Sequence, residues 1–198
     1  MLQPFTTLAV QTGVHSKKRI LEVACGSGMH SLFLAKTMLQ RGGVLVSCDI
    51  SDEMINLAKH KFEDQDIKAV IKAEELVPVG QQDFDLERFL RDQEVGESDR
   101  MVLGCLANNE CLPFKDATFD CYLANLSLML VDNHKNMLKE ALRVTQSGAA
   151  LAFTVWGRKQ NITNFSILEN VFAKHGLAPK IPPSKTPYDL GANPDTLR

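Results

Sequence analysis

The sequence lacks the features that mark several large classes of protein. Its charge shows no excess of either sign, since 22 Lys and Arg residues face 24 Asp and Glu residues, and this balance gives no reason to expect nucleic acid as a partner. It has no apolar run long enough to cross a bilayer, so we expect no membrane insertion. Residues 1–4 do not lead from a basic region into an apolar stretch, so we expect no signal peptide. With 198 residues and 44% hydrophobic content, the chain is expected to form a single domain.

Cysteine is present but has neither the number nor the spacing of a disulfide framework or a zinc site. The five cysteines are odd in number, and none forms a Cys-x-x-Cys pair. Several lie in apolar, strand-like surroundings. We therefore expect reduced, mostly buried thiols, no metal site and a cytoplasmic protein. The cysteines are Cys25, Cys48, Cys105, Cys111 and Cys121.

The chain is organised around residues 20–28, Ile-Leu-Glu-Val-Ala-Cys-Gly-Ser-Gly. The apolar start predicts a buried strand, the glycines predict a tight turn, and helical spacing of apolar residues follows over about 28–40. Gly26 and Gly28 have no Cβ, so the backbone can turn sharply and a ligand can come close. The N–H groups that begin a helix then face that ligand. This order is typical of a nucleotide-binding crevice.

Strands and helices alternate along most of the chain, which predicts an α/β fold with a parallel, Rossmann-like sheet between helices. Residues 2–16 are expected to form a short helix or lead-in segment that covers the sheet edge. The expected strands are 20–24, 44–48, 101–106, 119–125 and 151–156. A helix is expected after the N-cap Ser51, and two more are expected at about 133–145 and 164–175. The last of these is expected to turn Ile167, Leu168, Val171 and Phe172 inward.

Asp49 ends the second predicted strand, about 20 residues past the glycine turn, where dinucleotide-binding folds place an acid that binds a ribose diol. A carboxylate can accept hydrogen bonds from both ribose hydroxyls. A glycine turn and a strand-end acid at this spacing together indicate a site that binds a nucleotide.

Two segments depart from a compact sheet. Residues 63–100 are acidic and long for a connection, and contain one short predicted helix near Phe84–Leu90. We favour a solvated excursion over a substrate lid or partner surface. Residues 177–198 are rich in proline and are expected to be extended and irregular.

The motifs together resemble class I S-adenosylmethionine-dependent methyltransferases. Glu22-x-Ala24-x-Gly26-x-Gly28 is similar to the first motif of that family, and Asp49 matches its ribose-binding acid. Residues 108–120 resemble the run Asp-Ala-Glu-x-Leu-Pro-Phe-x-Asp-x-Ser-Phe-Asp of the small-molecule and quinone-biosynthesis branch. Residues 138–148 resemble the lead of that branch into the fifth strand. The likeness covers about residues 19–157.

The sequence also departs from the family. Ala24 replaces the first glycine, which we expect to be tolerated if the backbone there has no positive φ. Asn108 replaces an aspartate that contacts the adenine amino group, and its side-chain oxygen can still accept that hydrogen bond. The acidic insertion has no counterpart in compact members.

The expected strand order is 3-2-1-4-5, and the last two strands of the family are not found in the sequence. The fifth strand would then be a bare apolar edge, which soluble proteins avoid. We therefore expect a truncated or short form, or an edge that is covered by a dimer partner or by the chain's own tail.

The resemblance implies methyl transfer from S-adenosylmethionine, with S-adenosylhomocysteine as the product, to an unidentified small-molecule acceptor. No catalytic base is assigned, and His30 is expected to pack or cap. Two other functions stay open: a methyltransferase-like binding module without turnover, and a nicotinamide-dependent oxidoreductase. Ser31 stands where that oxidoreductase would want its third glycine. The predicted cofactor-binding residues are Glu22, Ala24, Cys25, Gly26, Ser27, Gly28, Asp49, Ile50, Met54, Asn108, Asn109, Asn125 and Leu126.

Overall fold

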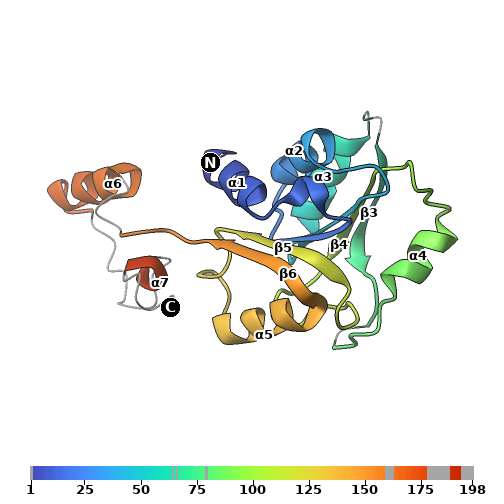
Figure 1. Ribbon diagram of the computed structural model, residues 1–198. Helices are drawn as coiled ribbons and strands as arrows, with labels where there is room; N and C mark the ends of the chain where they lie inside the picture. The colour runs from blue at the N-terminus through green and yellow to red at the C-terminus, as the bar shows by residue number, and fades with distance from the viewer. Residues whose placement is uncertain are drawn as a thin grey trace.

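The computed structural model describes residues 2–63, 65, 67–78, 80–158, 163–177 and 188–192 (Figure 1). Its centre is a six-stranded sheet in the order β3-β4-β2-β1-β5-β6. Every neighbouring pair of strands is parallel. The strands are β1 (Arg19–Val23), β2 (Val44–Asp49), β3 (Lys68–Glu75), β4 (Met101–Leu106), β5 (Phe119–Asn125) and β6 (Thr145–Thr154).

Helices cover both faces of the sheet (Figure 1). On one face lie α1 (Leu2–Gln11), α2 (Met29–Thr37) and α3 (Asp52–Phe62), and a short 3-10 helix, η1 (Val14–Ser16), follows α1. On the other face lie α4 (Leu86–Asp92) and α5 (His134–Val144). Helix α1 contacts β5 and β6, so the lead-in segment covers that end of the sheet, as its apolar residues predict.

The α/β fold class and the five predicted strands are confirmed. Their predicted order, 3-2-1-4-5, corresponds to β4-β2-β1-β5-β6. One strand was missed, because β3 lies inside the acidic segment that we expected to be an excursion. Its sequence, KAVIKAEE, mixes charged with apolar residues, and none of its side chains is fully buried, which is typical of an edge strand. The short helix predicted in the same segment is α4.

The chain reaches β6 earlier than its apolar pattern indicates. The predicted strand began at residue 151, but β6 begins at Thr145, directly after α5, and Thr145 pairs with Phe119. Thr145 is polar although buried, and the next three residues, Gln-Ser-Gly at 146–148, are exposed, so the start of β6 has no apolar pattern that would indicate a strand. In the described part of the chain, no strand follows β6, which forms an edge of the sheet.

Helix α6 (Thr163–Lys174) forms where a helix was predicted, but its predicted inward face was wrong. Ile167 is 56% exposed and Val171 is 47% exposed, and Phe172 is also exposed. The physical reason is that α6 lies beyond the end of β6, away from the sheet (Figure 1). The Leu168 side chain lies outside the described residues. Gly176 ends the helix with a positive φ of 67°, as its position predicts.

The predicted irregular tail contains one short helix, α7 (Asp189–Ala192). Leu190 of α7 packs against the core on the α4–α5 face. Arg158 Nε donates a hydrogen bond to the Ala192 carbonyl oxygen at 3.2 Å. Part of the tail therefore returns to the sheet near the end of β6. Residues 178–187 and 193–198 lie outside the described part. No described helix is both long and apolar enough to cross a membrane.

Candidate cofactor site

The candidate site lies where the chain changes direction across the sheet. From β1 the chain continues to β2, β3 and β4 on one side, and then crosses to β5 and β6 on the other. Ligands of open α/β sheets bind outside the carboxyl ends of the strands at such a switch point. The glycine turn follows β1, and residues 125–127 follow β5, so both predicted segments lie beside the switch.

The glycine turn has three residues with positive φ. Ala24 has a φ of 52°, Gly26 of 56° and Gly28 of 73°. The condition under which we expected alanine to be tolerated at position 24, a backbone without positive φ, is therefore not met, since the turn needs a left-handed residue even where the side chain disfavours it. Strain of this kind is concentrated at functional sites.

The two glycines serve different purposes. A Cβ on Gly26 would meet no atom within 4 Å, so this side of the turn is open to an approaching ligand. A Cβ on Gly28 would lie 2.7 Å from the Ala58 Cβ of α3. Gly28 therefore allows α2 to begin against α3, and also provides the N-cap of α2.

Asp49 lies beside the glycine turn, and its carboxylate stabilises the turn by accepting two backbone hydrogen bonds. Its Oδ2 accepts a hydrogen bond from Gly26 N at 2.8 Å, and its Oδ1 accepts one from Ser51 N at 3.1 Å. The side chain is largely buried. Each carboxylate oxygen keeps further acceptor capacity, so the predicted ribose contact remains compatible with this geometry.

Apolar side chains next to Asp49 face solvent. Ile50, directly after it, is 70% exposed, and Met54, one turn into α3, is also exposed. Met29 at the start of α2 is exposed as well. Large apolar residues that stay exposed near a polar site indicate a surface for an apolar group, such as the face of a base.

Glu22 is placed beneath the turn, and not on its surface. It is 2% exposed and accepts hydrogen bonds from Ser31 Oγ at 2.6 Å and from Ser47 Oγ at 3.3 Å. Burial raises the pKa of this carboxyl to about 7, against the opposing effect of the two serine hydroxyls, and the negative charge of Asp49 adds to the rise. Glu22 therefore ties β1, β2 and α2 together. The sequence analysis considered Ser31 only as a replacement for a third glycine. Its hydroxyl, in the first turn of α2, is the sequence feature that could have indicated a partner for Glu22.

The loop after β4 brings Asn108 and Asn109 to the same edge of the sheet. Asn108 is exposed, and its Oδ1 accepts a hydrogen bond from Glu110 N at 2.9 Å. Asn109 is buried, and its Oδ1 has no hydrogen-bond partner among the described residues. A buried amide oxygen without a partner favours a ligand or water at this point.

Asn125, the last residue of β5, and Leu126, which follows it, are held by hydrogen bonds to Thr154. Leu126 has a φ of 55°, which is costly for a branched side chain. Its N–H donates to the Thr154 carbonyl oxygen at 3.0 Å and to Thr154 Oγ1 at 2.9 Å. Thr154 Oγ1 in turn donates to Asn125 Oδ1 at 2.6 Å. The adjoining Ser127 hydroxyl is buried and has no partner among the described residues.

A charged pair on α5 fixes the loop that carries Asn108 and Asn109. Arg143 binds the Glu140 carboxylate through Nε at 2.8 Å and Nη2 at 2.7 Å. Arg143 also donates to the carbonyl oxygens of Leu112 at 2.9 Å and Phe114 at 2.7 Å. Glu140 Oε2 accepts from Leu112 N at 2.7 Å. Both residues lie in the segment 138–148 that resembles the family. The Glu-x-x-Arg spacing within it did not indicate that the pair would bind the loop.

The side chains nearest the turn do not supply an evident base. The His30 ring stacks on the Phe5 ring of α1 at a centroid distance of 4.2 Å, which agrees with the prediction that His30 packs or caps. Burial, followed by the positive charge of the N-terminus, lowers the pKa of His30. Cys25 is buried, and burial raises the pKa of its thiol well above the usual range. All five cysteines are free, four of them buried, as predicted.

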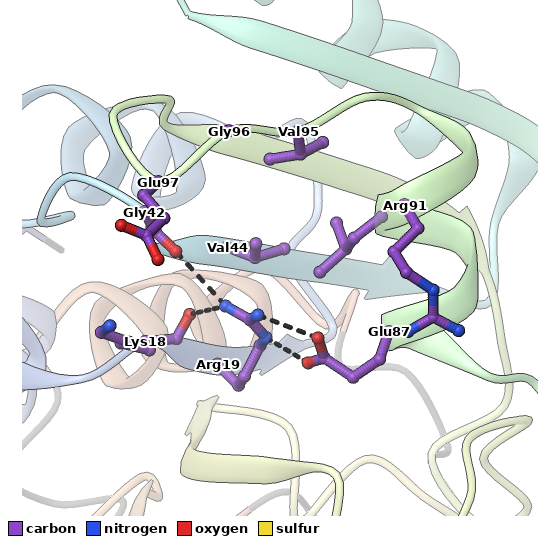
Figure 2. Close-up of a pocket in the computed structure, with 10 residues that line it drawn as sticks. Lys18, Arg19, Gly42, Val44, Glu87, Arg91, Val95, Gly96 and Glu97 are labelled. Carbon is purple, nitrogen blue, oxygen red and sulfur yellow. Dashed lines mark hydrogen bonds and ion pairs between the residues drawn. The ribbon is translucent and has the colours of Figure 1, made fainter.

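A cavity lies at the opposite, amino edge of the sheet, away from the glycine turn (Figure 2). It has a volume of about 320 Å³ and lies between the starts of β1 and β2 and helix α4. Figure 2 shows Arg19 at its centre, bonded to Glu87, Lys18 and Gly42. All three Arg19 side-chain nitrogens thus already donate hydrogen bonds, and the cavity is separate from the glycine turn.

Comparison with known proteins identifies the family. One model of a methyltransferase domain matches residues 20–91, and a second matches residues 88–153. The chain is 34% identical over 127 residues to the ubiquinone/menaquinone biosynthesis C-methyltransferase UbiE of Rickettsia prowazekii, covering 63% of this chain and 39% of that protein. It is 28% identical over 141 residues to a demethylmenaquinone methyltransferase of Lactiplantibacillus plantarum, covering 71% and 46%. The chain thus spans less than half the length of these curated relatives.

Solved structures share the fold. A SAM-dependent methyltransferase from Methanosarcina mazei matches with a TM-score of 0.51 and 21% identity, over 80% of this chain and 62% of that one. A putative methyltransferase from Bacillus halodurans matches with a TM-score of 0.52 and 15% identity, over 89% and 61%. The family rests on the two adjoining methyltransferase-domain models, which together match residues 20–153 and so include the glycine turn, Asp49 and the loop after β4. They show that the chain belongs to the class I S-adenosylmethionine-dependent methyltransferases.

Proposed function

We propose that this chain transfers a methyl group from S-adenosylmethionine to a small-molecule acceptor. One observation carries the proposal: the open side of Gly26, the Asp49 carboxylate and the exposed Ile50 side chain lie together at the carboxyl ends of β1 and β2. These groups match the chemistry of the cofactor. The glycine admits its amino-acid end, the carboxylate binds its ribose hydroxyls and the apolar surface packs on its base.

The other predicted residues receive roles around the same crevice. Cys25 and Ser27 contribute backbone groups of the turn, and Ala24 sets its left-handed entry. Met54 extends the apolar surface of Ile50. Glu22 acts from below, by fixing the strands that carry the turn.

Polar groups from the neighbouring loops complete the proposed site. Asn108 and Asn109 face the base from the loop after β4. Asn125 and Leu126 lie on the other side of the switch point, where the methyl group and the acceptor would meet. The orphaned Asn109 Oδ1 and Ser127 Oγ are consistent with bound polar groups at both ends.

The proposed mechanism asks little of side-chain chemistry. The cofactor, when bound, supplies a methyl group that is already activated by a sulfonium. The chain has to orient the acceptor in line with the S–CH₃ bond and to exclude water. An acceptor that is already nucleophilic needs no general base, in agreement with the packed His30.

Calorimetric titration with S-adenosylmethionine, S-adenosylhomocysteine and NAD tests the cofactor. We expect both sulfur nucleotides to bind and NAD not to bind. Failure of both sulfur nucleotides to bind would refute the proposal. Labelled S-adenosylmethionine then tests transfer, with demethylmenaquinone among the first acceptors because one relative is named a demethylmenaquinone methyltransferase.

A non-catalytic binding module is the second candidate. It is favoured by the edge position of β6 in the described part of the chain. This candidate predicts cofactor binding without turnover for any acceptor. A dimer across β6 remains a separate prediction, which sedimentation analysis can check. The free cysteines support, as part of the same proposal, a reducing compartment such as the cytoplasm.

A further inference from the structure

We propose that Glu75, on the inserted strand β3, recognises the amino group of the cofactor's adenine. In this role it replaces the aspartate that the family usually has at the position of Asn108. The inference rests on the proposed function. It assigns a specificity-determining residue to the acidic segment that sequence reasoning treated as an excursion.

A small cavity brings the insertion against the loop after β4. It has a volume of about 80 Å³ and lies at the carboxyl ends of β3 and β4. Glu75 and Gln81 line it from the insertion, Asn108 lines it from the facing loop, and Leu106, Ala107 and Pro113 add apolar wall. This space suits one edge of a ring with its substituent, and not a whole nucleoside.

Asn108 is poorly suited to replace an aspartate by itself. Its side chain is neutral, and one acceptor position of its Oδ1 already takes the hydrogen bond from Glu110 N. Glu75 has the charge that Asn108 lacks. Its side chain is exposed and makes no hydrogen bond or ion pair with any residue that the structure describes. Within one cavity, the free carboxylate therefore belongs to Glu75.

The cavity walls are held together on two sides. Glu75 pairs in register with Leu106, so the end of β3 is fixed against the end of β4. Past the cavity, Gln82 Nε2 donates to Glu140 Oε2 at 3.0 Å, and Phe84 N donates to the Pro113 carbonyl oxygen at 2.9 Å. The insertion and the Asn108 loop thus present their polar groups to the same space as one unit.

The chemistry of the base gives Glu75 a discriminating role. The exocyclic amino group of adenine donates hydrogen bonds, and a carboxylate accepts them strongly. Hypoxanthine carries a carbonyl oxygen at the same position, which a carboxylate repels. A glutamine could donate to that oxygen. Glu75 should therefore set a preference for adenosyl over inosyl ligands.

The test compares the binding of S-adenosylhomocysteine and S-inosylhomocysteine by calorimetry. The variants are Glu75→Gln and Glu75→Ala, and Glu74→Gln is the control. Glu74 is the neighbouring exposed glutamate, it lies 3.6 Å from Lys72 in an ion pair and it does not line the cavity. Melting curves establish that each variant is folded.

We expect wild-type protein to prefer the adenosyl ligand, and Glu75→Gln to reduce that preference on the order of tenfold. Glu75→Ala should weaken adenosyl binding and strengthen inosyl binding, because it removes both the acceptor for the amino group and the repulsion of the carbonyl oxygen, and Glu74→Gln should behave as wild type. An unchanged ratio in both Glu75 variants would overturn the assignment. If wild-type protein bound neither ligand, the proposed function itself would fail, which is a distinguishable result.

Discussion

Asp49 Oδ2 accepts a hydrogen bond from Gly26 N at 2.8 Å, so the acid that ends β2 holds the turn that follows β1. The same carboxylate is proposed to bind the cofactor ribose. Replacing it should thus affect both the empty protein and the complex, and this double effect can be measured.

Asp49→Ala should weaken S-adenosylhomocysteine binding by about 1–3 kcal/mol, because charge-assisted hydrogen bonds to the ribose are lost. It should also lower the melting temperature, because Gly26 N and Ser51 N lose their acceptor. Calorimetry and thermal melting check the two effects. Asp52→Ala, on the exposed first turn of α3, is the control and should change neither strongly. Unchanged affinity in Asp49→Ala would remove this residue from the site.

Ala24→Gly should stabilise the protein by about 1 kcal/mol. A left-handed alanine costs about 1–2 kcal/mol, and glycine removes this strain. Glycine also loses more conformational entropy on folding, but this loss cancels only part of the gain. Urea unfolding measures the change in the free energy of unfolding. Ala35→Gly, in the interior of α2, should instead destabilise by about 1 kcal/mol or more. A loss of stability in Ala24→Gly would show that packing of the Ala24 methyl outweighs backbone strain.

The pH dependence of stability should contain a contribution from Glu22. Its carboxyl pKa is about 7 in the folded protein and 4.5 in the reference state, so the folded state keeps its proton over a range where the unfolded state loses it. Stability from this group is complete below about pH 4.5 and falls as the pH rises to about 7, by on the order of 3 kcal/mol in total.

Glu22→Gln removes that contribution, because the amide does not titrate and can still accept from Ser31. Urea unfolding of both proteins at pH 5, 6, 7 and 8 measures it as a difference, in which the other titrating groups cancel. The glutamine variant should gain relative stability as the pH rises. A constant difference across this range would contradict the raised pKa.

The central sheet was predictable because its strands carry their own signal. β1, β2, β4 and β5 are buried on both faces, so each is a nearly continuous apolar run, and the glycine turn marks the switch point by its residue types. Edge elements lack that signal. β3 carries charges because one of its edges has no neighbouring strand, and α6 has the apolar spacing of a packed helix but no sheet beneath it.

The predicted site residues came from motif spacing, and spacing does not reveal their hydrogen-bond partners. Asp49 binds the turn, Asn108 binds Glu110 N and Glu22 is covered by Ser31. The positive φ of Ala24 depends on how the turn closes over β2, since Cys25 N donates to the Cys48 carbonyl oxygen at 2.9 Å. Contacts between distant segments of this kind required the structure.

The last prediction concerns the contact between α5 and the Asn108 loop. Arg143→Ala should destabilise the protein by about 3 kcal/mol, because the largely buried Glu140 carboxylate loses its positively charged partner. The carbonyl oxygens of Leu112 and Phe114 lose their donor as well. Arg143→Lys should recover only part of this, since an ammonium keeps the charge but cannot form the paired bonds of a guanidinium.

Urea unfolding of these variants measures the loss, and Arg88→Ala is the matched control. Arg88 is exposed on α4 and lies 3.9 Å from Asp92, so its removal should cost no more than about 0.5 kcal/mol. If the loop positions Asn108, Arg143→Ala should also bind S-adenosylhomocysteine more weakly than wild type under conditions where it remains folded. The affinity of Arg143→Lys should lie between the two. Equal stability of Arg143→Ala and Arg88→Ala would show that the loop is held by its apolar contacts, with Leu112 and Phe114 buried in the core.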